Sequence, residues 1–132
     1  MKSTKKWIAS LACLVLCLAF VAGCSSNRTV ADFIKANEKT FDAAKQSAES
    51  QGMKVDIIAR GNSLVYTYQF EQEMTKEQRD TLGKTLDQAI ETQKDTFLSI
   101  LKSLQAVVPS AESVIVEYLD ANSNVISSTE FK

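Results

Sequence analysis

Apolar and polar residues alternate along two neighbouring stretches in the middle of the chain, 53–60 and 63–71. Between them lies Gly61-Asn62, a pair suited to a two-residue turn because glycine tolerates a positive φ. Pairing the stretches directly across this turn gathers eight apolar or aromatic side chains on one face: Met53, Val55, Ile57, Ala59, Leu64, Tyr66, Tyr68 and Phe70. A shift of one residue would mix them with polar side chains. The pattern therefore predicts an antiparallel hairpin with one apolar face.

A second hairpin is predicted near the C-terminus. Residues 114–120 and 125–131 have similar alternation and flank the polar stretch 121–124. A four-residue loop would place Val116 opposite Thr129 and Val114 opposite Phe131, with Tyr118 on the same face.

Helical spacing of apolar residues precedes each hairpin. A start typical of a capped helix at Thr29 predicts a helix over 30–51, with a break near Asn37. A capping box at Thr75 begins a longer amphipathic pattern over 76–108, which ends at Pro109. At 1.5 Å per residue this second helix would span about 50 Å, whereas a strand of eight residues reaches about 27 Å. The helix must therefore overhang the sheet, bend or stop early.

These elements predict a single α+β domain over residues 29–132 with the order α-β-β-α-β-β. The apolar faces of both hairpins need a cover, which the long helix and the shorter N-terminal helix can supply. We therefore expect an antiparallel four-stranded sheet made of the two hairpins and covered by these helices.

The first 23 residues are typical of a cleaved signal peptide. Three lysines within residues 1–6 precede an apolar run over 8–22, which is shorter than the roughly 20 apolar residues that a transmembrane helix needs. The alternative is an uncleaved N-terminal anchor.

The run Val21-Ala22-Gly23-Cys24 gives this leader a distinctive end. Two small residues before a cysteine are typical of a lipobox, in which the cysteine sulfur receives a diacylglyceryl group and the residue becomes the new N-terminus. We therefore predict lipidation of Cys24 and a short tether over 24–28. Two long acyl chains would hold the protein at the extracytoplasmic face of the cell membrane, since each buried methylene contributes about 0.8 kcal/mol.

Composition narrows the range of partners. The leader contains three of the 15 basic residues and none of the 16 acidic ones, so a mature chain would have 12 basic and 16 acidic residues and a net charge of −4. Nucleic acids and anionic lipids favour basic clusters, and we expect no nucleic-acid partner. The three cysteines are Cys13, Cys17 and Cys24, so a mature domain would have no disulfide.

We expect no metal or other cofactor. The sequence has no histidine, and the only cysteine outside the leader is the one predicted to be acylated, so the usual zinc and copper ligands are missing. Asp120, Asn122 and Asn124 imitate the start of a calcium loop, but Val125 stands where that loop needs glycine and Phe131 where it needs glutamate. We interpret this segment as a plain turn.

Carboxylate catalysis is a remote alternative. The candidates are Glu71 and Glu73 after the first hairpin, and Asp87, Glu91 and Asp95 on the long helix. The helical three lie away from the apolar face among lysines, which is typical of a solvated surface. We therefore expect no enzymatic activity.

Two apolar residues on the polar face of the first hairpin indicate a partner surface. Ile58 and Val65 lie opposite each other there, although the first helix could also cover them. Tyr66, Tyr68 and Phe70 could offer a platform for a ligand, but their position on the apolar face favours core packing.

The chain also resembles a known family. The turn and strand Gly61-Asn62-Ser63-Leu64-Val65-Tyr66-Thr67-Tyr68, the capped helix from Thr75 and the terminal Glu130-Phe131 are similar to an uncharacterised family of small Gram-positive lipoproteins with a domain of unknown function. The resemblance covers about residues 29–132. Members often turn the last hairpin through Asp-Ala-Asp-Gly, where this chain has Asp120-Ala121-Asn122-Ser123. The resemblance implies a fold, an anchor and a compartment, but no site residues.

These observations favour a membrane-anchored binding module without enzymatic activity, whose partner is a protein or another component of the cell envelope. The alternative is an accessory lipoprotein that captures a small ligand in a groove between the long helix and the sheet.

Overall fold

A computed structural model describes residues 29–50 and 53–132. The predictions for the signal peptide (1–23), the tether (24–28), the lipobox Val21-Ala22-Gly23 and the lipidation of Cys24 lie outside the described residues.

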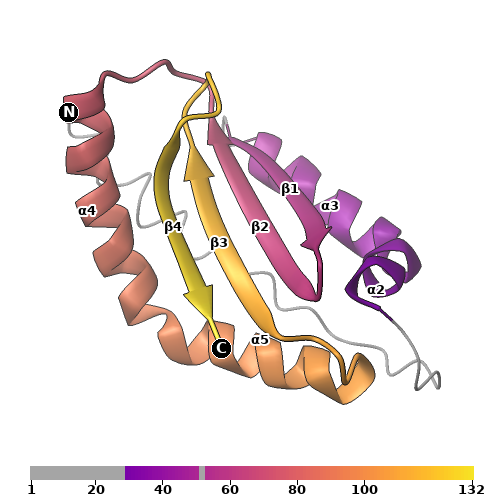
Figure 1. The fold of residues 1–132 in the computed structure, drawn as a ribbon. Helices are drawn as coiled ribbons and strands as arrows, with labels where there is room; N and C mark the ends of the chain where they lie inside the picture. The colour runs from indigo at the N-terminus through magenta and orange to yellow at the C-terminus, as the bar shows by residue number, and fades with distance from the viewer. Residues whose placement is uncertain (1–28, 51–52) are drawn as a thin grey trace.

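The described chain is an α+β domain of four helices and four strands (Figure 1). In order, the elements are α2 (Val30–Ala36), α3 (Glu38–Glu49), β1 (Met53–Arg60), β2 (Ser63–Phe70), α4 (Lys76–Thr92), α5 (Lys94–Val107), β3 (Ser113–Leu119) and β4 (Val125–Phe131). The predicted order holds, except that each predicted helix is divided in two.

Capping explains where the helical segments begin. The hydroxyl of Thr29 accepts a hydrogen bond from the backbone N–H of Asp32, and Thr75 does the same for Gln78, so both predicted helix starts are confirmed. The first break is at Asn37, as predicted, where the side-chain amide donates to the carbonyl of Phe33 at 2.8 Å.

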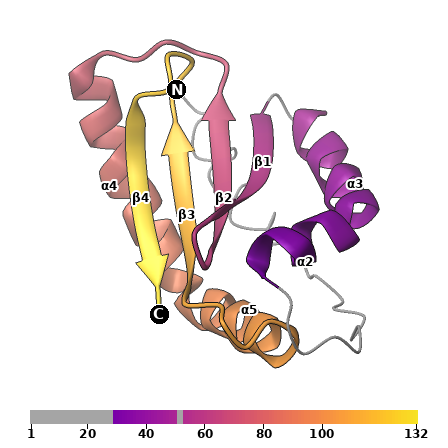
Figure 2. The same ribbon diagram turned by 45° about the vertical axis from the view of Figure 1, so that its right-hand side comes forward.

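The second break is at Gln93, where the backbone N–H donates to the carbonyl of Ile90, three residues back, at 2.9 Å. This shorter bond pattern tightens the last turn of α4. The change of direction there lets α5 run beneath the sheet while α4 runs beside β4 (Figures 1 and 2). The predicted helix therefore bends, which is one of the three ways in which a helix longer than the strands could fit.

The sheet has the order β1-β2-β3-β4, and its first hairpin is confirmed residue for residue, from Met53 opposite Phe70 to Arg60 opposite Ser63. The expectation of a wholly antiparallel sheet is wrong, because β2 and β3 pair in parallel. Helices α4 and α5 form the crossover that returns the chain to the end of the sheet where β2 begins, and such a crossover joins parallel neighbours.

The second hairpin has the predicted pairs Val114–Phe131 and Val116–Thr129. Its register shifts between Tyr118 and Leu119, close to the turn. Within that turn Ser123 has a φ of 65°, the left-handed conformation that favours glycine.

Replacing Ser123 with glycine should therefore stabilise the domain by about 0.5–1 kcal/mol, because relief of left-handed strain outweighs the greater flexibility of glycine in the unfolded chain. Chemical denaturation would measure this as a higher midpoint with an unchanged slope. The exposed neighbour Asn122 offers a control: Asn122→Gly should not stabilise. A lower midpoint for Ser123→Gly would contradict the strain argument.

The core lies between one face of the sheet and the helices. Helices α2 and α3 pack against β1, α4 packs against β4, and α5 packs against β3 and β4. The buried cluster combines the apolar face of both hairpins with Phe33 and Phe41 from the N-terminal helices and Leu86, Phe97 and Leu104 from α4 and α5. One continuous core therefore joins all eight elements.

Both edges of the sheet are protected. At the β4 edge, Gly83 of α4 is so close that an added Cβ would lie 2.5 Å from the carbonyl oxygen of Ile126. At the β1 edge, Asp56 Oδ1 accepts a hydrogen bond from the backbone N–H of Ile57 and lies 3.2 Å from Lys45 Nζ of α3. A helix and a folded-back side chain thus occupy positions where another strand would have to pair.

Candidate partner-binding face

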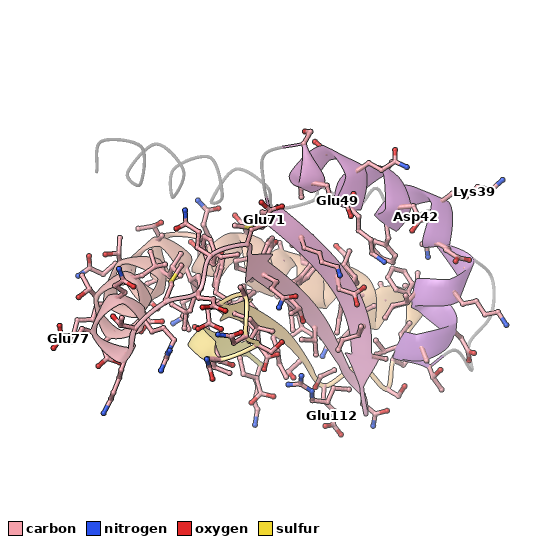
Figure 3. All side chains as sticks on the ribbon, turned by 90° about the horizontal axis from the view of Figure 1, so that it is seen from above. Lys39, Asp42, Glu49, Glu71, Glu77 and Glu112 are labelled. Atoms are coloured by element: carbon pink, nitrogen blue, oxygen red, sulfur yellow. The ribbon has the colours of Figure 1, made fainter. Side chains whose placement is uncertain are left out.

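The sheet face opposite the helices is open. Seen from above, α3 with its labelled Lys39, Asp42 and Glu49 lies on one side of the sheet (Figure 3). On the other side, alternate residues of β1 are exposed, namely Lys54, Asp56, Ile58 and Arg60. The central strands add half-buried side chains to this outer face, including Thr67 and Ile115. The outer face is therefore a flat surface of mixed character.

The two residues predicted as a partner surface differ sharply in exposure. Ile58 is 37% exposed, whereas Val65 is fully buried. Neither N-terminal helix covers Val65, because both pack on the apolar face of the sheet. Of the predicted surface, only Ile58 is therefore exposed. Ile115 lies two strands away from it, in line across the sheet on the same face.

The cover over Val65 is an ion pair between Arg60 on β1 and Glu117 on β3. Two parallel hydrogen bonds join the guanidinium to the carboxylate, at 2.9 and 3.1 Å. Arg60 pairs with Ser63 of β2 and Glu117 with Thr67, so the bridge crosses β2 at the residue midway between them, which is Val65.

This pair also links two strands that are not neighbours in the sheet. The hydrogen bonds with Glu117 and its negative charge raise the pKa of Arg60 above its ordinary value, so the guanidinium stays charged at any physiological pH. Sequence reasoning missed the pair because its members are 57 residues apart. The two residues have opposite charges and lie on the polar faces of their strands. This pattern predicts an ion pair only once β3 is known to neighbour β2.

Below the bridge, a chain of hydroxyl groups crosses the same face. Ser113 donates to the Glu130 carboxylate at 2.7 Å, and its oxygen lies 2.6 Å from that of Ser63. Because the proton of Ser113 is committed to Glu130, Ser63 is the donor to Ser113. The two buried hydroxyl groups are thus satisfied, and the bonds hold three strands in register.

Asp120 forms a plain turn, as predicted. Its buried carboxylate accepts hydrogen bonds from the backbone N–H groups of Asn122 and Asn124, from the Asn124 side chain and from Arg79 of α4. Burial acts to raise the pKa of Asp120, but these hydrogen bonds and the charge of Arg79 outweigh burial and hold it below its ordinary value. Hydrogen-bond donors already occupy the carboxylate oxygens, whereas a calcium loop directs its oxygens at the ion.

The other candidate carboxylates do not converge. Glu71, Glu73, Asp87, Glu91 and Asp95 are all exposed. Asp87 accepts a hydrogen bond from the Ser127 hydroxyl group, and the break at Gln93 separates Asp95 from the α4 pair. Within residues 29–50 and 53–132, no three acidic side chains are grouped so that they could hold a metal ion.

The tyrosines belong to the core, as predicted. Tyr66 and Tyr68 are at most 3% exposed, and the rings of Tyr68 and Tyr118 stack with centroids 4.9 Å apart. Burial raises the pKa of Tyr118 to about 12 and those of Tyr66 and Tyr68 further above the ordinary value. These rings are packed side chains and not an accessible platform.

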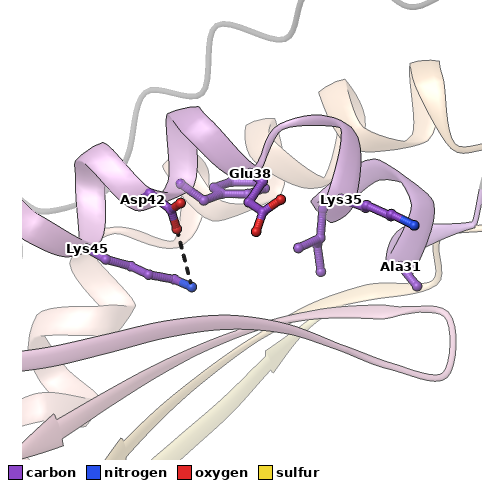
Figure 4. Close-up of a pocket in the computed structure, with 7 residues that line it drawn as sticks. Ala31, Lys35, Glu38, Asp42 and Lys45 are labelled. Atoms are coloured by element: carbon purple, nitrogen blue, oxygen red, sulfur yellow. Dashed lines mark ion pairs between the residues drawn. The ribbon is translucent and has the colours of Figure 1, made fainter.

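A shallow hollow lies beside α2 and α3 (Figure 4). It has a volume of about 330 Å³ and charges of both signs at its rim, from Lys35, Glu38, Asp42 and Lys45. Lys45 Nζ lies 4.0 Å from Asp42 Oδ1, in addition to its bridge to Asp56. The amino group of Lys45 is therefore already paired within the domain.

Comparison with known proteins identifies a family over most of the chain. Residues 30–131 match the domain of unknown function DUF4854, so the expected resemblance to such a domain is confirmed. No curated protein and no solved structure matches the chain. No helix in the part of the chain that the structure describes is long and apolar enough to cross a membrane.

Proposed function

Since the chain belongs to the DUF4854 family, whose function is undefined, we propose its function from its own residues. We propose that it is a lipid-anchored protein of the extracytoplasmic membrane face and that its domain binds a protein or another envelope component without catalysing a reaction. Cys24 would provide the anchor and the outer sheet face the contact surface.

The observation that carries the binding role is the contrast between the two faces of the sheet. Helices cover one face, while the other combines exposed Ile58 with the Arg60–Glu117 bridge. Interfaces typically combine an apolar centre with a rim of polar and charged groups. Because the bridge fixes its own side chains before a partner arrives, binding would cost little additional ordering.

The alternative of ligand capture between the long helix and the sheet has less support. The closeness of Gly83 to the Ile126 carbonyl leaves no room for a ligand between α4 and β4. Phe97 of α5 stacks on Phe131 with centroids 4.9 Å apart, which fills the corresponding space beneath the sheet. These contacts favour the binding-module proposal.

The anchor can be tested with Cys24→Ala, expressed in bacteria that process lipoproteins. The unchanged protein should fractionate with membranes and show by mass spectrometry a first residue Cys24 with a diacylglyceryl group. The variant should keep its leader and lack the lipid, because acylation precedes cleavage. Ser25→Ala is the matched control and should be processed normally. Native protein with an unmodified Cys24 sulfur would contradict the anchor.

The contact surface can be tested by photo-crosslinking in intact cells. A photoreactive amino acid at Ile58 should give a discrete adduct with one partner, whereas the same probe at exposed Lys84 on α4 should not. Identical adducts from both positions, or none from position 58, would contradict a contact through the outer face. The result does not depend on knowing the partner beforehand.

A further inference from the structure

We propose that one end of the domain faces the lipid bilayer: the end formed by the β1–β2 turn, α2 and the loop over 108–112. The opposite end, with the β2–α4 loop and the β3–β4 turn, would point away from the membrane. This inference rests on the proposed lipid anchor at Cys24 and adds an orientation to it.

The length of the tether limits where the domain can lie. Thr29 caps α2 and is five residues after Cys24. Five fully extended residues span at most about 18 Å. An eight-residue strand is about 27 Å long, which exceeds the reach of the tether, so the far end of the sheet cannot face the lipid in place of the end that contains Thr29. The end that contains Thr29 must therefore remain close to the headgroups.

The chain path identifies that end. Helix α3 runs alongside β1 and ends next to its first residue, so α2, at the far end of α3, lies near the last residue of β1. The loop before β3 joins the same end, because the backbone N–H of Glu112 donates to the carbonyl of Asn62 at 2.9 Å. Figures 1 and 2 both show α2, the β1–β2 turn and α5 at one end of the sheet.

The distribution of charged residues favours a domain that stands on the end near Thr29, with its far end pointing away from the membrane. Among the residues that the structure describes, the far end exposes Glu49, Glu71, Glu73, Glu77 and Asp80 but only Lys54 and Lys76 as exposed basic residues, since Arg79 is paired with Asp120. Figure 3 looks onto the molecule from this end. An anionic lipid surface repels such an end.

The end near the tether has a balanced charge. Its exposed cations include Lys35 on α2 and Lys102 on α5, and its exposed acids include Glu38 and Glu112. Arg60 is paired with Glu117, and Lys132 Nζ lies 3.7 Å from Glu130 Oε1. Tipping the domain over would bring the acidic far end towards anionic lipids, and repulsion opposes this movement. The outer sheet face therefore stays accessible from the side.

Site-directed spin labels on the lipidated protein can test this orientation. The protein would be reconstituted in nanodiscs of phosphatidylcholine and phosphatidylglycerol that contain a paramagnetic nickel-chelating lipid. The labels would be attached at Ser110→Cys near the tether and at Glu73→Cys at the far end. Both positions are exposed, and an acylated Cys24 leaves no competing thiol. Relaxation caused by the headgroup nickel should be at least fivefold stronger at 110 than at 73.

Three outcomes distinguish the proposals. Stronger relaxation at 110 supports the orientation, and a label at Asn62→Cys in the neighbouring turn should behave in the same way. Equal relaxation at 110 and 73, or stronger relaxation at 73, would overturn the orientation while leaving the anchor intact. A protein that does not elute with the nanodiscs lacks the anchor, and this outcome would overturn both proposals.

Discussion

Truncating Phe97 to alanine should destabilise the domain by about 3–5 kcal/mol, the range found for large aromatic residues in cores. Phe97 is 4% exposed, stacks on Phe131 of β4 and lies 6.4 Å from the ring centroid of Tyr66 on β2. It therefore connects α5 to two strands that are not adjacent. The cavity would remove contacts from three elements, and their backbones cannot all move inward at once.

Equilibrium denaturation provides the measurement for Phe97→Ala, with the midpoint converted to free energy through the slope. Thr96→Ala is the matched control, because Thr96 is exposed on the same turn of α5, and its change should stay within about 0.5 kcal/mol. A loss below about 1 kcal/mol for Phe97→Ala would mean that Phe97 does not connect these elements as described.

Replacing Gly83 with alanine should cost about 1–3 kcal/mol, the usual range for overpacking, although alanine is the better helix former. The new Cβ would lie 2.5 Å from the carbonyl oxygen of Ile126. That oxygen belongs to the backbone of β4 and cannot rotate away, so α4 would have to shift away from the sheet. The melting temperature should fall by several degrees, since 1 kcal/mol corresponds to about 4–8 °C in a domain of this size.

Two further variants separate this steric effect from helix propensity and backbone strain. Lys84→Ala changes an exposed neighbour on α4 and should be nearly neutral. Gly61→Ala adds a Cβ at a φ of 60° with no atom within 4 Å, so it should cost only the strain of about 1–2 kcal/mol. If Gly83→Ala stabilised the domain, helix propensity would outweigh the contact with Ile126.

Local patterns allowed accurate prediction of each hairpin. In the first hairpin, the alternation around Gly61-Asn62 permits one register only, and Gly61 has the positive φ that the turn requires. In the second hairpin, the pairs around Val116 were predictable, but the shift at Tyr118 and Leu119 was not. That shift depends on the turn, where Asp120 is held by Arg79 of a distant helix.

Relations between the hairpins were not predictable from these patterns. Alternation defines which face of a hairpin is buried but not which strand of the other hairpin lies beside it. The parallel pairing of β2 with β3 follows from the path of α4 and α5, and that path depends on a break at Gln93 without a nearby proline or glycine. For the same reason, neither alternative predicted for Val65, a partner surface or a cover by the first helix, included the ion pair that Glu117 on β3 makes above it.

The protected edges of the sheet matter most for a protein confined to a surface. Molecules anchored in one leaflet meet far more often than the same number dispersed in solution, so even a weak tendency to form intermolecular sheets would lead to polymers. Asp56 at one edge and α4 at the other deny a neighbouring copy the backbone groups it would need. If the proposed anchor at Cys24 holds, these two edges would let many copies share one membrane without pairing strand to strand.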